Sequence, residues 1–228
     1  MKISAVLFDL DGTLLDMDLD SFLVRYFAAL ESALAPLASD IDVISAVQRS
    51  TMTMMGEHAG RSNSDVFWED FEARTSRSHG DLKEAADRFY RDGFPLLGDS
   101  YGPMPGAREA VEQARSAGMR VALATNPIFP RAAVDARLAW AGLEPALFDH
   151  VTSYESATTC KPMPAYFAET AAALGAACEE CLMVGDDHDL DLPAAQTGMR
   201  VWCVKASDGR PADGSLLDLA AEFRAMGS

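Results

Sequence analysis

Hydrophobic positions along the chain follow two different patterns. Short apolar runs bounded by polar or glycine residues are typical of buried strands in a parallel sheet, and they lie at 3–8, 120–125, 148–153, 182–185 and 201–204. Apolar residues spaced three or four apart predict helices at 106–117, 130–141, 164–174, 192–197 and 215–226. Strands that alternate with helices over short connections predict an α/β fold with a doubly wound, Rossmann-like parallel sheet.

Between the first strand and residue 97 the pattern is helical throughout. The spacing predicts one helix from Phe22 to Leu30, with Asp20 or Ser21 as its N-cap. Further helices are expected at 42–55, 64–73 and 81–92, with Pro36, 56–63 and 76–80 as the separators. We therefore predict an α/β core domain of residues 1–15 and 98–228, and an inserted all-helical cap domain of residues 16–97 that acts as a lid.

Composition narrows the range of partners. The 228 residues are 49% hydrophobic and 24% charged, as in an ordinary globular protein, and the formal net charge is −16. Nucleic acids and anionic membranes require basic surface, so we expect neither as a partner. The first apolar run is too short for a leader and no run is long enough to cross a membrane, so a cytoplasmic location is expected.

Cysteine spacing raises a second type of site. Cys178 and Cys181 have the spacing of a redox or zinc pair. They precede a predicted strand rather than a helix N-terminus, and no second close Cys/His pair completes a zinc site. We expect structural thiols in a reducing compartment.

The first strand ends in Asp9-Leu10-Asp11-Gly12. Residues two apart in extended backbone point to the same side, and Gly12 permits a sharp turn. Ligands of open α/β sheets bind at the carboxyl ends of strands. Two neighbouring carboxylates there favour a divalent cation, although Asp and Gly are also ordinary residues of a solvated turn.

The strand at 182–185 ends in a second acidic group. Asp186, Asp187, Asp189 and Asp191 lie within six residues, and this density of negative charge requires a counter-cation. Oxygen ligands without a thiolate favour Mg²⁺. His188 lies among them and is expected to be an uninvolved solvent contact.

Two weaker signals suit a phosphate group. Thr125 and Asn126 end another strand, where a hydroxyl and free backbone N–H groups can bind phosphate, although both residues also cap helices. Lys161, followed by Pro162, offers a compact positive charge, although a surface lysine is an equally ordinary residue.

Taken in order, Asp9-x-Asp11-Gly12-Thr13, Thr125, Lys161 and Gly185-Asp186 with Asp191 resemble the four motifs of the haloacid dehalogenase superfamily of phosphohydrolases. The helical insertion after the first motif is similar to the helical cap of subfamily I. Asn126 departs from the pattern, since many members carry serine beside the threonine.

The resemblance implies a role for each residue. Asp9 would be the nucleophile that becomes an aspartyl-phosphate, and Asp11 the general acid and base. The implied phosphate ligands are Thr125, Asn126 and Lys161. The implied ligands of Mg²⁺ are Asp9, the backbone carbonyl of Asp11 and Asp186, surrounded by Asp187 and Asp191.

These roles predict a magnesium-dependent phosphatase acting on a small phosphorylated metabolite. A phosphomutase acting on a sugar phosphate remains an alternative, and a non-catalytic binding or regulatory protein is a further one. A dehalogenase is disfavoured, because such relatives lack an acid at the position of Asp11. Candidate substrate contacts are Asp18, Asp20 and the loop 56–63, in which Arg61 could bind a second anionic group. The oligomeric state and the roles of Cys178, Cys181 and His188 stay open.

Overall fold

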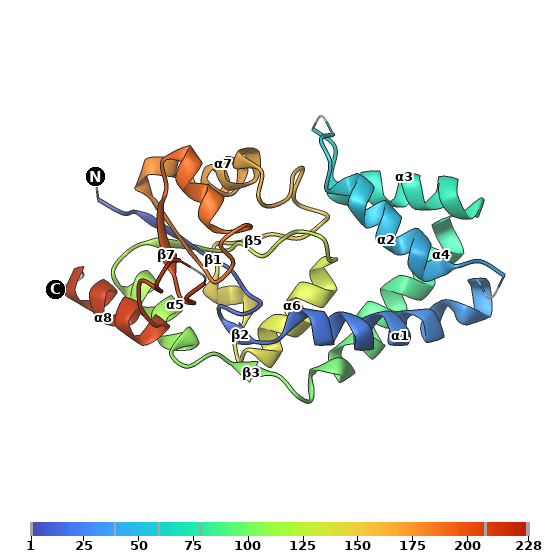
Figure 1. Ribbon diagram of the computed structural model, residues 1–228, viewed down its shortest axis with the longest axis horizontal. Coiled ribbons are helices and arrows are strands. Elements are labelled where there is room, and N and C mark those ends of the chain that lie inside the picture. Colours follow the sequence, from blue (N-terminus) through green and yellow to red (C-terminus); the bar gives the residue numbers. More distant parts are fainter. Residues whose placement is uncertain (1, 39, 59, 78, 208, 227–228) are drawn as a thin grey trace.

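A five-stranded parallel sheet forms the centre of the molecule (Figure 1). The computed structural model describes residues 2–38, 40–58, 60–77, 79–207 and 209–226. The strands lie in the order β5 (His150–Val151), β4 (Arg120–Leu123), β1 (Ala5–Phe8), β6 (Cys181–Gly185) and β7 (Arg200–Cys203). β1 is the middle strand and all four of its residues are buried. The predicted doubly wound α/β core is confirmed.

The register of the sheet brings the ends of its three central strands level. Phe8 of β1 pairs with Leu123 of β4 on one side and with Val184 of β6 on the other. The residues that follow these positions therefore leave the sheet at one edge. Asp9 and Asp186, 177 positions apart in sequence, become neighbours for this reason.

Alternate residues of β1 face opposite layers of helices. Val6 and Phe8 share a hydrophobic core with α5 (Ala107–Ser116), α6 (Arg131–Trp140) and α8 (Leu216–Met226). Ala5 and Leu7 share a second core with α7 (Pro164–Ala173) and the 3₁₀ turn Leu192–Thr197. The sheet is thus covered on both faces, and polar groups reach solvent at its edges.

Helices fill the segment between β1 and α5. They are α1 (Leu19–Ala38), α2 (Val43–Met54), α3 (Asn63–Thr75) and α4 (His79–Arg88), followed by a π turn (Phe89–Gly93) and a 3₁₀ turn (Phe94–Gly98). Asp42 and Ser62 begin α2 and α3, because their side chains accept backbone N–H groups three residues ahead. In Figure 1 these helices lie to one side of the sheet. The domain boundaries given above remain a prediction.

A short antiparallel ribbon closes the base of this helical segment. β2 (Leu15–Asp16) pairs with β3 (Gly102–Pro103), so the chain leaves and re-enters the core at one place. The sequence analysis missed this ribbon, because two residues are too few to show a periodic pattern.

The first helix is longer than predicted. Pro36 lies inside α1 rather than after it. Proline in the last turn removes one hydrogen bond, while Leu34 and Ala38 stay buried beside it. The helix also begins earlier than expected, because the carboxylate of Asp18, not Asp20 or Ser21, accepts the N–H of Ser21 at 2.9 Å. Among the described helices none is long and apolar enough to span a membrane.

Aromatic side chains join the helical segment to the core. Tyr26 of α1 packs edge-on against Phe129 with ring centroids 5.3 Å apart, and Phe94 stacks on Trp140 at 5.4 Å. Aromatic pairs of this kind stabilise a contact beyond the burial of their surface. The first pair holds α1 against the loop before α6, and the second holds the 3₁₀ turn Phe94–Gly98 against α6.

Candidate active site

Three carboxylates converge at the strand tips. Asp9 follows β1, Asp186 follows β6, and Asp191 lies in the turn beyond. One oxygen from each lies within 4.8 Å of the others. Asp9 is 8% exposed and Asp191 1%. Asp9 and Asp186 are therefore close enough to share one cation, as the sequence analysis requires.

Lys161 supplies positive charge to this cluster. Its Nζ donates to Oδ1 of Asp9 at 2.6 Å and to Oδ1 of Asp191 at 2.5 Å. Burial alone would lower the pKa of Lys161, but the carboxylates of Asp191 and Asp9 together raise it above its ordinary value. The ammonium group therefore stays charged although the side chain is almost fully buried.

The cluster as a whole carries excess negative charge. With all three carboxylates ionised, the single ammonium would leave two negative charges uncompensated. Burial raises the pKa of Asp9, with Lys161 opposing the shift, and burial together with Asp191 raises the pKa of Asp186. Lys205 lies 3.6 Å from Asp186 but is 70% exposed, so water screens its charge. An all-oxygen donor set with this charge fits a hard divalent cation.

Two glycines permit the close approach of these acids. Gly12 has φ +82°, and a Cβ there would collide with the carboxylate of Asp186. A Cβ on Gly185 would collide with the carboxylate of Asp191. Both positions thus exclude a side chain, and Gly12 also adopts backbone angles that favour glycine.

Thr125 and Asn126 lie beside the acids, as their position after β4 predicts. The carbonyl of Thr125 accepts hydrogen bonds from the hydroxyls of Thr152 at 2.8 Å and Tyr166 at 2.9 Å, which fix the loop. Oδ1 of Asn126 accepts the backbone N–H of Lys161 at 3.2 Å. Asn126 therefore links the loop that carries Lys161 to the end of β4, a contact that the sequence alone did not reveal.

The carboxylate of Asp11 turns away from the three-acid cluster. Its Oδ2 accepts a hydrogen bond from Nη1 of Arg137 in α6. Burial raises the pKa of Asp11, and the Arg137 guanidinium opposes that shift. Asp9 and Asp11 therefore pair with different cations, although two residues in extended backbone were expected to point to one side.

The sequence analysis did not identify Arg137. Arginine is common on exposed helix faces, and its partner is 126 residues away. One signal was present: Ala133, Val134 and Leu138 form the buried stripe of α6, and Arg137 lies on that stripe by helical spacing. An arginine on an apolar stripe requires a buried anionic partner, and the aspartates at the strand ends were candidates for that partner.

The remaining polar residues of the β6 loop organise the loop itself. Oδ1 of Asp187 accepts the N–H groups of Asp189 at 2.8 Å and Leu190 at 2.9 Å. The backbone N–H of Asp187, rather than its exposed carboxylate, contacts Asp191 at 3.1 Å. Nε2 of His188 lies 3.2 Å from the carbonyl of Lys205, outside the three-acid cluster.

Cys178 and Cys181 lie at the opposite end of β6 from Asp186. Cys178 and Cys181 are free, and Sγ of Cys181 donates to the carbonyl of Ala177 at 3.3 Å. Burial raises the pKa of Cys181 to about 12, so it stays a thiol at neutral pH.

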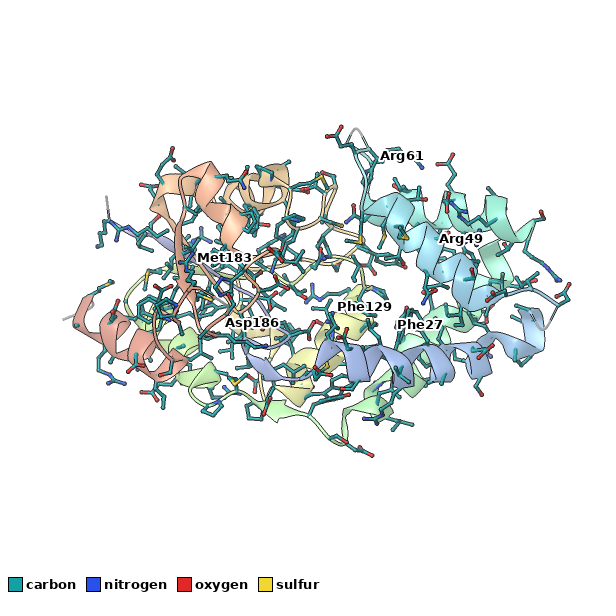
Figure 2. The ribbon with its side chains drawn as sticks, viewed as in Figure 1. Phe27, Arg49, Arg61, Phe129, Met183 and Asp186 are labelled. Atoms are coloured by element: carbon teal, nitrogen blue, oxygen red, sulfur yellow. The ribbon has the colours of Figure 1, made fainter. Side chains whose placement is uncertain are left out.

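A pocket of about 770 Å³ opens above the acids. Its walls include Thr125, Asn126, Lys161 and Arg137 from the core, and Asp18 and Asp20 from the start of α1. The pocket lining does not include Arg61, which instead pairs with Glu69 at 2.5 Å. Figure 2 shows Arg61 far from Asp186. A contact between Arg61 and a second anionic group stays a prediction.

Comparison with known proteins places this arrangement in a family. The chain is 29% identical over 218 residues to the protein SUPPRESSOR OF QUENCHING 1, chloroplastic, of Arabidopsis thaliana, which covers 90% of this chain and 18% of that protein. It is 34% identical over 140 residues to Phosphatase MT3486 of Mycobacterium tuberculosis, covering 60% of this chain and 61% of that protein. The chain thus spans less than two thirds of either relative.

A solved structure and a family model agree with this placement. The crystal structure of a HAD phosphatase from Thermococcus onnurineus has the same fold, with a TM-score of 0.60, 21% identity and 98% of each chain covered. Residues 3–198 match the family model described as haloacid dehalogenase-like hydrolase. The chain therefore belongs to the haloacid dehalogenase-like hydrolases.

Proposed function

We propose that the protein is a magnesium-dependent phosphatase that hydrolyses a small phosphomonoester through an aspartyl-phosphate on Asp9. One observation carries the proposal: the Asp9 carboxylate lies at the floor of a pocket, bonded to a buried lysine and grouped with Asp186 and Asp191. Membership of a hydrolase family and the similarity to a phosphatase from Mycobacterium tuberculosis agree with it.

Asp9 acts as the nucleophile. A carboxylate oxygen of Asp9 forms a bond to phosphorus while the bond from phosphorus to the ester oxygen breaks. Lys161 favours the ionised form of Asp9, because its charge opposes the effect of burial on the Asp9 pKa. Mg²⁺, held by the carboxylates of Asp9 and Asp186 and the carbonyl of Asp11, would supply a positive charge that neutralises the phosphoryl oxygens.

Asp11 transfers the proton in both halves of the reaction. In the first half it gives its proton to the departing ester oxygen, and in the second it takes a proton from the water that attacks phosphorus and releases Asp9. The upward shift of the Asp11 pKa by burial suits the first role, since the acid must begin protonated. A dehalogenase has no need of such a group, so Asp11 favours phosphate ester chemistry.

The loops after β4 and before α7 bind the phosphate group of the substrate. Lys161 contributes its ammonium, and Thr125 and Asn126 line the same pocket. Asp191 holds Lys161 in position through the 2.5 Å contact. Asp187 belongs to this proposal only through its backbone, which contacts Asp191.

Phosphate release from p-nitrophenyl phosphate, with and without Mg²⁺, tests the proposal. Wild-type activity should require the cation. The Asp9→Asn variant should have at least about 1,000-fold lower activity, since a covalent step is removed. Asp189→Asn, an exposed acid of the β6 loop outside the pocket lining, is the matched control and should keep full activity. Activity that survives in Asp9→Asn would refute the assigned nucleophile, and activity after thorough chelation would refute the metal.

A phosphomutase differs in its product. Incubation with sugar monophosphates should release inorganic phosphate in proportion to substrate loss. Conversion to an isomer without release would replace the phosphatase proposal by the mutase alternative.

A further inference from the structure

Arg137 is a buried charge whose hydrogen bonds are incomplete. The side chain is 1% exposed, yet Nη2 has no hydrogen-bond partner among the described residues. Nε reaches the carbonyl of Ala133 only at 3.4 Å. A buried donor without a partner costs stability, so a retained one calls for a ligand.

The ion pair between Arg137 and Asp11 also leaves hydrogen-bonding atoms without partners. A guanidinium and a carboxylate commonly form two parallel hydrogen bonds. Here Nη1 alone bonds to Oδ2 of Asp11, and Oδ1 of Asp11 also lacks a partner. Asp11 therefore does not occupy the second amino group of Arg137.

The orientation of the guanidinium is fixed from outside the pair. Its central carbon lies 4.7 Å from the ring centroid of Phe129, within the range of a cation–π contact. Arg137 and Phe129 both line the pocket above Asp9. In the view of Figure 2, Phe129 lies between Asp186 and Phe27 of α1, on the side where the helical segment covers the core.

The geometry points to Arg137 as a specificity-determining residue that binds a second anionic group on the substrate, a carboxylate or a phosphate. This inference rests on the proposed function, because the position of the substrate follows from the roles of Asp9 and Asp11. Asp11 must reach the ester oxygen to protonate it, and Nη1 of Arg137 bonds to Asp11. Nη2 is bonded to the same carbon as Nη1, so an anionic group that Nη2 binds would lie close to that oxygen.

The substrate class that follows is a phosphomonoester with an anionic group close to the ester carbon. Nη2 carries two N–H donors and part of the guanidinium charge, which suit a carboxylate or phosphate oxygen. This contact also explains how a protein with a net charge of −16 accommodates a doubly anionic substrate: Lys161 and Arg137 neutralise its two ends separately.

Matched substrates test the inference. The probes are 2-phosphoglycolate, which carries a carboxylate, ethane-1,2-diyl bisphosphate, which carries a second phosphate, and ethyl phosphate, which carries neither. We expect wild-type kcat/KM to be at least tenfold higher for one of the first two than for ethyl phosphate, and the preferred probe distinguishes the two anions. In Arg137→Gln this preference should fall to less than about threefold, and Arg137→Lys should restore part of it, because charge without the planar fork recovers part of the contact.

Controls separate selectivity from structure. Arg131→Gln removes an exposed arginine of the same helix, paired with Asp135 at 2.7 Å, and should leave the preference unchanged. A second measurement uses Asp9→Asn, in which calorimetric binding of the preferred anionic probe with Mg²⁺ should weaken at least tenfold when Arg137→Gln is added. Binding of ethyl phosphate should change less than threefold.

The failures are distinguishable. If Arg137→Gln lowers kcat/KM for all three probes by the same factor, the residue only positions Asp11 and the inference is wrong. If the wild type prefers neither anionic probe, it is also wrong, while the phosphatase proposal stands on hydrolysis of ethyl phosphate. If no probe releases phosphate, the proposed function fails and this inference with it.

Discussion

Replacing Lys161 by methionine removes the buried positive charge of the site without leaving a large cavity. The ammonium contacts Asp9 at 2.6 Å and Asp191 at 2.5 Å, and all three side chains are buried. Breaking a buried ion pair by removing one partner costs about 3–5 kcal/mol. We therefore expect Lys161→Met to lower the free energy of unfolding at pH 7, in the absence of divalent cations, by about 4 kcal/mol.

An independent estimate gives the same size. The variant can relieve repulsion by protonating one carboxylate, and for an acid with an unfolded pKa of about 3.9 this costs about 4 kcal/mol at pH 7, at about 1.4 kcal/mol per pKa unit. For a chain of this length about 4 kcal/mol corresponds to a fall in Tm of about 8–16 °C. The cost of protonating a carboxylate is thus an upper limit on the free energy of unfolding that the variant loses for each unpaired carboxylate.

The electrostatic account also predicts how the stability of Lys161→Met changes with pH. Asp9 already has a raised pKa because burial outweighs Lys161, and without the lysine its pKa rises further. The folded variant then binds more protons than the unfolded chain, so its stability falls as pH rises. The deficit relative to wild type should be near zero at pH 4 and should grow by up to about 1.4 kcal/mol per pH unit toward pH 7.

Urea unfolding in EDTA from pH 4.5 to 7.5 measures this deficit. Lys83→Met is the matched control: Lys83 contacts Asp87 at a similar 2.6 Å, but it is 40% exposed, so its loss should cost less than about 1 kcal/mol at every pH. Equal losses in the two variants, or a deficit in Lys161→Met that does not change with pH, would refute the electrostatic account of the cluster.

Three further predictions follow from the site and its attachment to the helices. Mg²⁺ at 100 times its dissociation constant should stabilise the wild type by about 2.7 kcal/mol in thermal unfolding, and Asp186→Asn should lose most of that gain whereas Asp189→Asn keeps it. Gly12→Ala should reduce phosphatase activity at least tenfold, because its Cβ meets the Asp186 carboxylate, whereas Gly118→Ala, with φ +80° but open space around it, should retain activity despite similar backbone strain. Asn63→Ala should lower the free energy of unfolding by about 1–3 kcal/mol, because the fully buried amide of Asn63 donates to the carbonyls of Pro127 at 3.1 Å and Thr159 at 3.3 Å; an unchanged urea midpoint would contradict this.

The sheet was predictable because its signals are local. Each strand is an apolar run and each polar tip follows directly in sequence, so Asp9, Thr125 and Asp186 could be assigned to one edge from the order of strands and helices alone. The resemblance to the family rested on the same polar residues at the strand ends, together with Lys161. The existence of the helices between β1 and α5 was also predictable, since their apolar spacing is periodic over whole turns.

Side-chain pairing was not predictable in the same way. The partner of Asp11 lies in α6, and the helical pattern that predicts α6 does not say which strand tip its arginine faces. The ribbon of β2 and β3 and the interior position of Pro36 escaped for a related reason: both depend on contacts with distant residues rather than on a local period. Tertiary packing decided all three.

These pairings divide the pocket into two halves. Asp9 faces Lys161 and the acids that follow β6, whereas Asp11 faces Arg137. Under the proposed function, the phosphoryl group and its cation would occupy the first half, and the leaving group would occupy the second. Arg137 stacks on Phe129, which packs against Tyr26 of α1, so the leaving group would face the helical segment. On the same proposal, residues at the start of α1 would select the leaving group without contacting phosphorus.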